Sequence, residues 1–391
     1  MYLKKLGLEN FRKFKDYQEF EFKPITILVG PNNSGKSSLI KALLLLQENL
    51  INGLDDLKFG SETKHRILSF GHALNSSSKK PYFRIKCEFD AAGKDIHAIE
   101  QDVWQDKGAT TIDVTFEQGL KNDNTAIRSI ELFDQDGKLV ISGRQSLSSL
   151  FKDSRVRVYV LEAIQSFLDY APPYRSIGLQ RYSKKKFINF SKQLKGLKPI
   201  LDTGQQEENS FITKWCGSDP GYNIGDVRLL ENDDFYEIQL MRDNQLMDLS
   251  HLGTGASQIL SIIIQIVTHD QQMVILEEPE TNLHPKYQSK LADMLVDGIN
   301  EPLGNRFIIE THSEYLIRKL QYLVAKDSRK DIKHRKVKSE DIQIYYFSDI
   351  KNKAPELLTI ENDGSLSGDF GKGFFDEAPY LITELWKAQR N

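Results

Sequence analysis

The feature that most constrains the fold is a glycine-rich segment near the N-terminus. Residues 30–37 read Gly-Pro-Asn-Asn-Ser-Gly-Lys-Ser, a full match to GxxxxGK[ST]. The apolar strand pattern ITILV precedes the segment, and an apolar helical pattern over 37–50 follows it. In such a loop, backbone N–H groups and the positive end of the helix dipole converge on phosphate oxygens. The segment therefore predicts nucleotide binding on an α/β fold.

The residue types of this loop give each position an expected role. Gly35 lets the backbone approach the phosphates, Lys36 reaches the β- and γ-phosphates, and the Ser37 hydroxyl ligates Mg²⁺. ATP and Mg²⁺ are therefore the expected cofactors. The residues expected to contact ATP here are Gly30, Pro31, Asn32, Asn33, Ser34, Gly35, Lys36, Ser37 and Ser38.

A pair of carboxylates ends a second apolar strand, MVILEEPE, at 273–280. Glu277 is expected to hold Mg²⁺ through water, and Glu278 to orient and deprotonate the attacking water. By itself the pair would be a polar strand end leading into the turn at Pro279. The phosphate-binding loop elsewhere in the chain favours the catalytic interpretation.

Two further segments lie on either side of this strand. LSHLGTGASQIL (249–260) is a glycine-rich turn leading into an apolar helix, and RFIIETHSE (306–314) is a strand that ends near His312. Apolar residues at helical spacing lie between the two strands: Tyr287, Leu291, Leu295 and Ile299. This order predicts a parallel strand–helix–strand unit. In that setting His312 is an expected γ-phosphate contact rather than a packed or surface histidine.

The rest of the chain gives coarser signals. Residues 81–145 alternate as strands, with Asp136-Gly137 as a hairpin turn. Residues 148–200 appear mostly helical, and 201–225 read as a polar, glycine-rich loop. We therefore expect the chain to divide into three parts: an N-terminal ATPase lobe with an antiparallel β subdomain (1–147), a mostly helical insertion (148–234) and a C-terminal ATPase lobe (235–391).

Composition excludes several classes of protein. The chain has 52 basic and 55 acidic residues and a net charge of −3, so bulk positive charge does not hold nucleic acid. A 39% hydrophobic content is typical of a globular chain. No apolar run is long enough for a bilayer and no apolar signal core opens the chain. Two cysteines cannot form a disulfide framework or a zinc site. We expect a soluble cytoplasmic protein without a membrane partner.

The motifs together resemble an ABC-type ATPase head of the RecF/SMC/OLD-like branch. LENFRKF and GPNNSGKSS resemble the start and Walker A loop of that branch, and GTGASQ stands at the place of the ABC signature. EEPETNLHP resembles the Walker B strand and D-loop, and ETHSEYLI the switch-histidine segment. The tail from IYYF to GKGFFDEAPYLITEL resembles small stand-alone bacterial members of this group. The resemblance to the branch covers residues 1–70 and 235–391. The implied fold is an α/β head with a mixed sheet core, an antiparallel β lobe and a helical middle insertion.

The resemblance implies further site residues. Ser257 would contact the γ-phosphate held by the opposite protomer, and Asn282 would lie in the D-loop at the dimer seam. Arg12 resembles an arginine that approaches nucleotide in some relatives, although a solvated edge-strand arginine fits equally. Two departures stand out: Glu277 replaces the more common aspartate, and GTGAS replaces LSGG. Gln47 lies on the helix after the loop, the wrong place for a Q-loop.

The resemblance also implies a function. The chain would be an ATP-hydrolysing switch that forms a head-to-tail homodimer around ATP. It would control a separately encoded effector such as a nuclease, or a DNA transaction, in bacterial antiphage defence or DNA maintenance. The resemblance implies no OLD-type TOPRIM nuclease in this chain, so we expect nuclease action to need a separate partner chain. Two alternatives stay open: an ATP-gated scaffold without hydrolysis, and a P-loop kinase for a small molecule.

Two basic stretches remain unassigned. Arg181–Lys198 has no acidic residue, and Arg318–Lys338 has nine Lys/Arg against two aspartates. Aromatic residues interleave the first stretch: Tyr182, Phe187 and Phe190. Both stretches fit a DNA or RNA phosphate footprint. A solvated helix face or a site for an acidic partner protein fits them as well.

Overall fold

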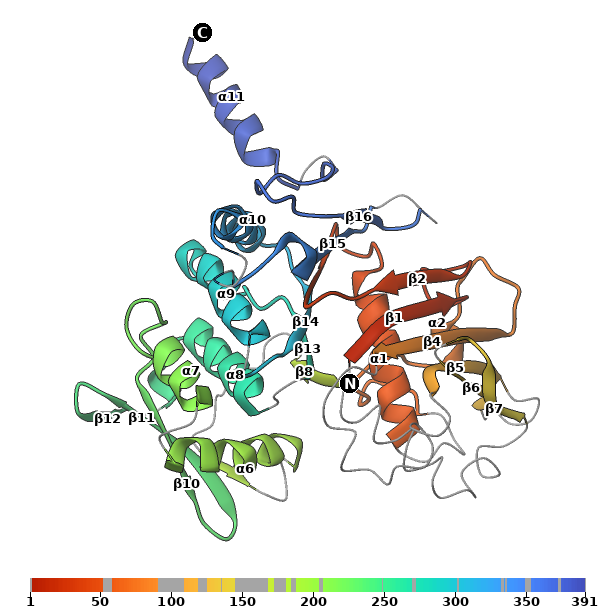
Figure 1. Cartoon of the computed structure of the whole chain (residues 1–391), viewed down its shortest axis with the longest axis horizontal. Coiled ribbons are helices and arrows are strands. Elements are labelled where there is room, and N and C mark those ends of the chain that lie inside the picture. Colours follow the sequence, from red (N-terminus) through yellow and green to blue (C-terminus); the bar gives the residue numbers. More distant parts are fainter. Residues whose placement is uncertain are drawn as a thin grey trace. The chain divides into compact units, whose positions relative to one another are not determined.

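The computed structural model places most of the chain in two compact units, whose elements are labelled in Figure 1. The described residues are 2–51, 58–90, 109–118, 125–134, 136–144, 168–171, 181–183, 188–203, 207–247, 249–268, 272–300, 302–331, 334, 336–348, 353–371 and 374–390. The first unit contains Met1–Lys23, Gly30–Leu168 and Phe347–Glu356; the second contains Pro24–Val29, Asp169–Tyr346 and Leu357–Asn391.

The first unit is built on an antiparallel sheet. Its described strands are β1 (Tyr2–Glu9), β2 (Gln18–Glu21), β4 (Tyr82–Asp90), β5 (Ala109–Gln118), β6 (Thr125–Asp134) and β7 (Leu139–Arg144), in the order β2-β1-β4-β5-β6-β7. Helices α1 (Lys36–Ile51) and α2 (Phe70–Ala73) belong to the same unit. The β6–β7 hairpin turns at Gly137, which has a φ of +76°. The hairpin expected at Asp136-Gly137 is thus confirmed.

An aromatic cluster forms part of the first unit's core. Phe83 is fully buried; its ring lies 4.7 Å from that of Phe116, 5.2 Å from that of Phe11 and 5.3 Å from that of Phe70. These rings join the segment after β1, at Phe11, to β4, β5 and α2. Each buried ring removes a large apolar area from water, so the cluster stabilises the sheet against its helices.

The second unit is built on a mixed sheet whose described strands run in the order β16-β15-β3-β14-β13-β8. The strands are β3 (Ile25–Val29), β8 (Leu168–Ala171), β13 (Met273–Glu277), β14 (Arg306–Glu310), β15 (Ile342–Tyr346) and β16 (Glu356–Leu358). The pairs β13–β14, β14–β3 and β15–β3 are parallel. All residues of β3 and β15 are buried, as in a sheet covered on both faces.

Helices and a smaller sheet complete the second unit. The helices are α6 (Ile188–Thr203), α7 (Glu207–Cys216), α8 (Thr254–Thr268), α9 (Pro285–Ile299), α10 (Glu314–Ser328) and α11 (Glu377–Arg390), with short 3-10 turns at Leu249–His251 and Ser339–Asp341. The smaller sheet joins β9 (Arg181–Ser183), β10 (Asp226–Glu231), β11 (Phe235–Arg242) and β12 (Gln245–Met247). Helices α9 and α10 pack side by side, and α6 and α7 pack on α8 (Figure 1).

The structure refines one expectation for the middle of the chain and corrects another. Within residues 148–200 the structure describes 168–171, 181–183 and 188–200, where α6 agrees with the expected helix and the short strands β8 and β9 were not expected. Residues 201–225 are not mainly a loop, because α7 occupies Glu207–Cys216. Its residues Phe211, Ile212 and Trp215 are buried, since their spacing of one and four places them on one helical face. The polar residues around them hid this pattern.

The remaining expected elements are confirmed: the first three strands, the helix after the glycine-rich loop, and the β13–α9–β14 parallel unit. The two compact units cut across the three expected consecutive ranges. The reason is that β3 pairs with β14 and β15, so residues 24–29 leave the N-terminal unit. None of the described helices is long and apolar enough to cross a membrane.

We expect Phe83→Ala to lower the free energy of unfolding of the first unit by about 3–5 kcal/mol, because it leaves a cavity among three other rings. Urea unfolding followed by circular dichroism measures the change. Leu68→Ala is the matched control, since Leu68 is 60% exposed. Equal losses in the two variants would contradict the assigned core.

Candidate functional site

The glycine-rich loop of the first unit has backbone that other residues adopt poorly. Gly30 has a φ of +139° and Gly35 a φ of +121°. A Cβ at Gly30 would lie 2.0 Å from the Phe347 carbonyl oxygen, so no side chain fits there. Asn33 also has a positive φ, +62°. Helix α1 begins at Lys36, so its unpaired N–H groups face the loop.

The loop fits a phosphate group. The Lys36 ammonium donates to the carbonyl oxygens of Gly30 (2.8 Å) and Pro31 (2.9 Å), which hold it across the loop. The Ser34 hydroxyl is buried and has no hydrogen-bond partner among the described residues. A buried hydroxyl donor beside a lysine and a helix N-terminus is the setting that an anionic oxygen satisfies. Pro31, Asn32 and Asn33 are exposed.

Arg12 lies beside the same loop, within the first unit. Its Nε donates to the Ser38 hydroxyl (3.2 Å), and its Nη1 donates to the His72 carbonyl (3.4 Å). Burial lowers the pKa of the Arg12 guanidinium. The Asn75 side chain donates to the Arg12 carbonyl (2.6 Å) and holds this backbone, whose φ is +49°. Arg12 is therefore anchored beside the start of α1 rather than free on a strand edge.

In the second unit, Glu277 ends β13 and Glu278 begins a strained turn. Glu278 has a φ of +45°, which is rare for a residue other than glycine. Its N–H donates to the Glu310 carbonyl at 2.7 Å, and its carboxylate accepts from the Thr281 hydroxyl at 3.4 Å. Strained backbone of this kind is concentrated at functional sites.

Helix α8 clamps this turn. The Gln258 amide donates to the carbonyl oxygens of Glu278 and Pro279, at 3.2 Å each. Close packing explains the glycine in the GTGASQ motif, because a Cβ on Gly255 would lie 2.7 Å from the Asn282 carbonyl oxygen. The signature-like helix and the carboxylate turn are therefore one rigid piece of the second unit.

Glu280 connects the same turn to the histidine segment. Its Oε1 accepts the His312 N–H at 2.7 Å, and Glu280 is only 8% exposed. Burial raises the pKa of the Glu280 carboxyl; the His312 hydrogen bond opposes this, and the Glu278 charge adds to it. The His312 residue itself is exposed. The segment then enters α10, capped by the Ser313 hydroxyl, which accepts the Leu316 N–H at 3.1 Å.

The residues expected at a dimer seam differ in accessibility. Asn282 is exposed and has a φ of +63°. Ser257 is only 4% exposed, and its hydroxyl donates to the Gly253 carbonyl at 3.4 Å. Gly253 and Thr254, at the start of α8, are exposed. The role of Ser257 stays a prediction, and the accessible part of its turn is the Gly253–Thr254 pair.

Two residues that connect these motifs were not assigned from the sequence. Gln258 and Glu280 lie inside segments that the motif search singled out, GTGASQ and EEPETNLHP. Their hydrogen bonds span 20 or more residues along the chain. The sequence shows only that both residues are polar. The structure shows that Gln258 is 7% and Glu280 8% exposed. Buried polar groups are normally hydrogen-bonded, so their burial is what indicates a connecting role.

Comparisons with known proteins agree with this arrangement. Residues 1–159 and 144–317 match the family described as AAA ATPase domain. Residues 337–385 match a family of proteins of unknown function, DUF3696. The endonuclease GajA of Bacillus cereus (strain HuB5-5) is 21% identical over 404 residues, covering 81% of this chain and 58% of GajA. The uncharacterised protein MJ1542 of Methanocaldococcus jannaschii is 30% identical over 69 residues, 18% of this chain and 8% of that protein.

The chain thus spans less than two thirds of the length of these relatives. Among solved structures, an Smc head bound to the C-terminal winged-helix domain of ScpA aligns with a TM-score of 0.55 and 12% identity, over 92% of this chain and 98% of that one. An Smc head with an extended coiled coil, bound to the C-terminal domain of ScpA from Pyrococcus furiosus, aligns with a TM-score of 0.52 and 11% identity, over 98% and 99%. The expected ABC-type head fold is confirmed.

We expect Glu280→Gln to change how stability depends on pH. The folded pKa lies above the ordinary 4.5, so the unfolded chain releases this proton first as the pH rises. The wild type therefore loses stability between pH 4.5 and the folded pKa, whereas the glutamine variant has no such loss at this site. Urea unfolding at a series of pH values measures the free energy of unfolding of both proteins. The stability of Glu280→Gln relative to the wild type should rise as the pH increases through that window.

Glu340→Gln is the matched control for this experiment, because the Glu340 side chain is 70% exposed. A gap between Glu280→Gln and the wild type that stays constant with pH would contradict a buried, hydrogen-bonded Glu280.

Proposed function

Because this chain belongs to the family of AAA ATPase domains and is an ABC-type ATPase of the RecF/SMC/OLD branch, we propose that it binds and hydrolyses ATP with Mg²⁺, between two copies of itself. The observation that carries the proposal is the register of three parallel strands. Leu28 of β3 lies opposite Glu310 of β14, which lies opposite Glu277 of β13.

In the second unit, this register ends β3, β13 and β14 at one edge of the sheet. Neighbouring strands lie about 4.8 Å apart, so the ends of β3 and β13 are separated by about 10 Å across β14. The glycine-rich loop follows β3 directly, Glu278 follows β13, and His312 follows β14 by two residues. Ligands of parallel α/β sheets bind outside the carboxyl ends of the strands.

The residues supply the roles that hydrolysis needs. Lys36 would hold the β- and γ-phosphates, and Ser37 and Glu277 would hold Mg²⁺, the latter through water. Bound Mg²⁺ supplies charge neutralisation of the phosphates. Glu278 would accept the proton of the attacking water, held in place by Thr281 and by its strained backbone.

His312 and Arg12 would act at the edges of the phosphate chain. His312 would contact the γ-phosphate, with its backbone held by Glu280. Arg12 is held beside Ser38 at the start of α1, which suits an approach to nucleotide. The exposed Gly253–Thr254 turn and Asn282 would face the partner protomer, with Ser257 behind the turn as its support. ATP would therefore join two protomers head to tail.

We propose that ATP-driven closure controls a separately encoded effector. Two observations support an effector: GajA is an endonuclease, and the aligned Smc heads are bound to domains of ScpA. A nuclease partner in bacterial antiphage defence, or a partner in DNA maintenance, suits such a switch. This step rests on similarity rather than on the chemistry of the site.

We expect Lys36→Ala to abolish ATP binding, because the loop loses its cation for the β- and γ-phosphates. Glu278→Gln should keep binding and lower turnover about a hundredfold or more, the effect of losing a general base. Fluorescent-nucleotide binding and phosphate release measure the two. Lys353→Ala, a lysine outside the loop, is the control. Normal turnover by Glu278→Gln would mean that another base acts, whereas ATP binding without phosphate release by the wild type would favour the ATP-gated scaffold.

The shared site can be tested with mixed protomers. Thr254→Arg adds a bulky cation to the exposed turn but leaves the loop intact, whereas Lys36→Ala does the reverse. Each variant alone should be inactive. Mixed dimers contain one site with both lesions and one with neither, so random pairing should restore hydrolysis to roughly a quarter of wild type if the sites act independently.

The second readout is ATP-dependent crosslinking of protomers that carry Asn282→Cys. It detects mixed dimers even if hydrolysis requires both sites of the dimer to be intact. Absence of rescue by both readouts, in a protein whose wild type dimerises with ATP, would exclude the Gly253–Thr254 turn as a contact in trans.

A further inference from the structure

A basic hollow of about 530 Å³ lies within the second unit, between α7, α9 and α10. Seven lysines and three aspartates line it, a surplus of four positive charges in a chain whose net charge is −3. The hollow belongs to none of the ATPase motifs. Five of the seven lysines form ion pairs, that of Lys290 being with Asp219 outside the lining, and the two without an ion pair among the described residues are Lys286 and Lys326.

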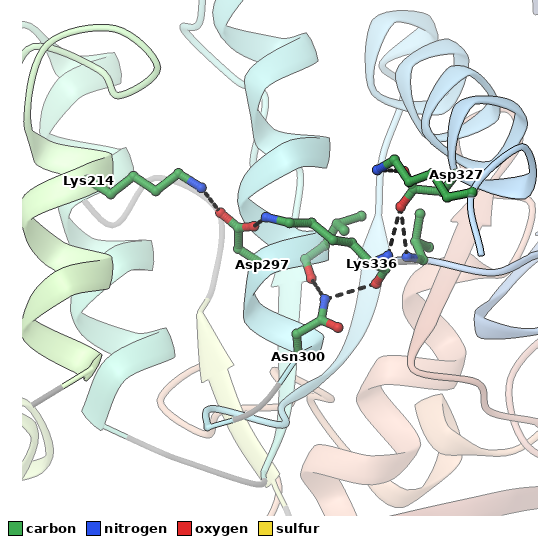
Figure 2. A network of polar contacts seen from close by, with 8 residues as sticks. Lys214, Asp297, Asn300, Asp327 and Lys336 are labelled. Atoms are coloured by element: carbon green, nitrogen blue, oxygen red, sulfur yellow. Dashed lines mark hydrogen bonds and ion pairs between the residues drawn. The ribbon is translucent and has the colours of Figure 1, made fainter. Parts of the chain in front are cut away.

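The aspartates of the hollow serve mainly to hold its walls. Asp297 on α9 binds the ammonium groups of both Lys214 and Lys336, as Figure 2 shows. Asp327 on α10 binds Lys330 and accepts the Lys336 N–H at 2.8 Å. These contacts join three segments of the unit into one wall.

Other lysines of the hollow have no such carboxylate. Among the described residues, neither Lys286 on α9 nor Lys326 on α10 makes an ion pair. Both are exposed. Their charges are therefore available to an external anion.

A stripe of tyrosine and lysine continues this charge along α10. Its members are Tyr315, Lys319, Tyr322 and Lys326, whose spacings of four, three and four place them on one helical face. Tyr315 is 50% exposed and Tyr322 is 54% exposed. The ammonium groups of Lys319 and Lys326 lie 5.2 and 5.8 Å from the centre of the Tyr322 ring. One exposed ring is thus flanked by two ammonium groups, of which that of Lys319 is also paired with the Asp293 carboxylate at 3.2 Å.

This pattern favours nucleic acid over an acidic polypeptide. Carboxylates would need only the lysines, whereas exposed rings between lysines also provide stacking surfaces for bases. Tyr315 and Tyr322 are separated by about 10 Å along the helix, about three nucleotide steps of a stacked strand. Bases are available for stacking in a single strand and are hidden in a duplex.

We propose that the α10 stripe and the adjoining basic hollow form a binding site for single-stranded nucleic acid. Lys286 and Lys326 contact its phosphates, and the Tyr322 ring stacks on a base. Tyr315 belongs to the ETHSEYLI segment, but Lys286, Tyr322 and Lys326 lie outside the ATPase motifs. The site needs no ATP for its chemistry, so it goes beyond the proposed ATPase function. It also locates one of the two basic stretches of the sequence, Arg318–Lys338, on a defined surface.

The test uses fluorescence anisotropy with labelled oligothymidylate, in the absence of ATP. Binding should weaken steeply with salt, and Lys286→Gln and Lys326→Gln should each reduce the slope of log affinity against log salt by about 0.7. Tyr322→Ala should weaken binding about tenfold or more, whereas Tyr322→Phe should retain it, because stacking needs the ring and not the hydroxyl.

Matched controls lie elsewhere on the chain. Tyr380→Ala removes an exposed tyrosine of α11, and Lys353→Gln removes an exposed lysine; neither should alter binding. ATP hydrolysis by Tyr322→Ala should equal that of the wild type and shows that the variant is folded. If the wild type lacks hydrolysis, the ATPase proposal fails while oligonucleotide binding still tests this site.

Three results would overturn the proposal. One is no salt-dependent binding of oligothymidylate at low salt. Another is equal oligothymidylate affinity of Tyr322→Ala and the wild type, which would mean that the lysine charges bind the strand without stacking on Tyr322. The third is tighter binding of polyglutamate than of oligothymidylate, which would make the hollow a site for an acidic protein.

Discussion

The parallel register of β3, β14 and β13 is the constraint on which the rest of the site depends. Parallel strands end together at one edge, so the three strand ends that lead into the motif segments lie together in the second unit without any contact between their side chains. A register shift of one residue would reverse which side chains of β14 face each side of the sheet. Complete burial of β3 makes such a shift costly, because every residue of the strand would change its packing.

In the second unit, hydrogen bonds connect helix α8, the turn after β13 and the segment after β14. Gln258 holds the carbonyls of Glu278 and Pro279, and Glu280 holds the backbone of His312. These hydrogen bonds join the signature-like helix, the carboxylate turn and the histidine segment within the second unit. Such a path suits a site shared between protomers, since a partner that presses on the start of α8 would displace the groups around Glu278.

Local patterns were sufficient to predict much of this from the sequence. The glycine-rich loop, β13, α9 and the hairpin at Asp136-Gly137 follow from residue types and spacings within a few positions. The pairing of β3 with β14 and β15 could not be predicted that way, because it joins Ile25 to Phe307 and to Ile342, which are 282 and 317 positions away. The same holds for Gln258, whose role depends on packing of α8 against a distant turn. Helix α7 was missed because its four-residue apolar face lies among polar residues.

Helix α10 joins the two functions argued for the second unit. Its N-terminus follows His312 directly, and its exposed face carries the tyrosine–lysine stripe. The Ser313 hydroxyl that caps α10 also donates to the Gln288 side-chain oxygen of α9 at 2.7 Å. This hydrogen bond connects the start of α10 to the first turn of α9. A strand of nucleic acid bound along α10 changes hydrolysis only if it binds one arrangement of the His312–Glu280 contact better than another. A rigid helix with its ligand on one face and the histidine segment at its end provides the physical link that such a preference requires.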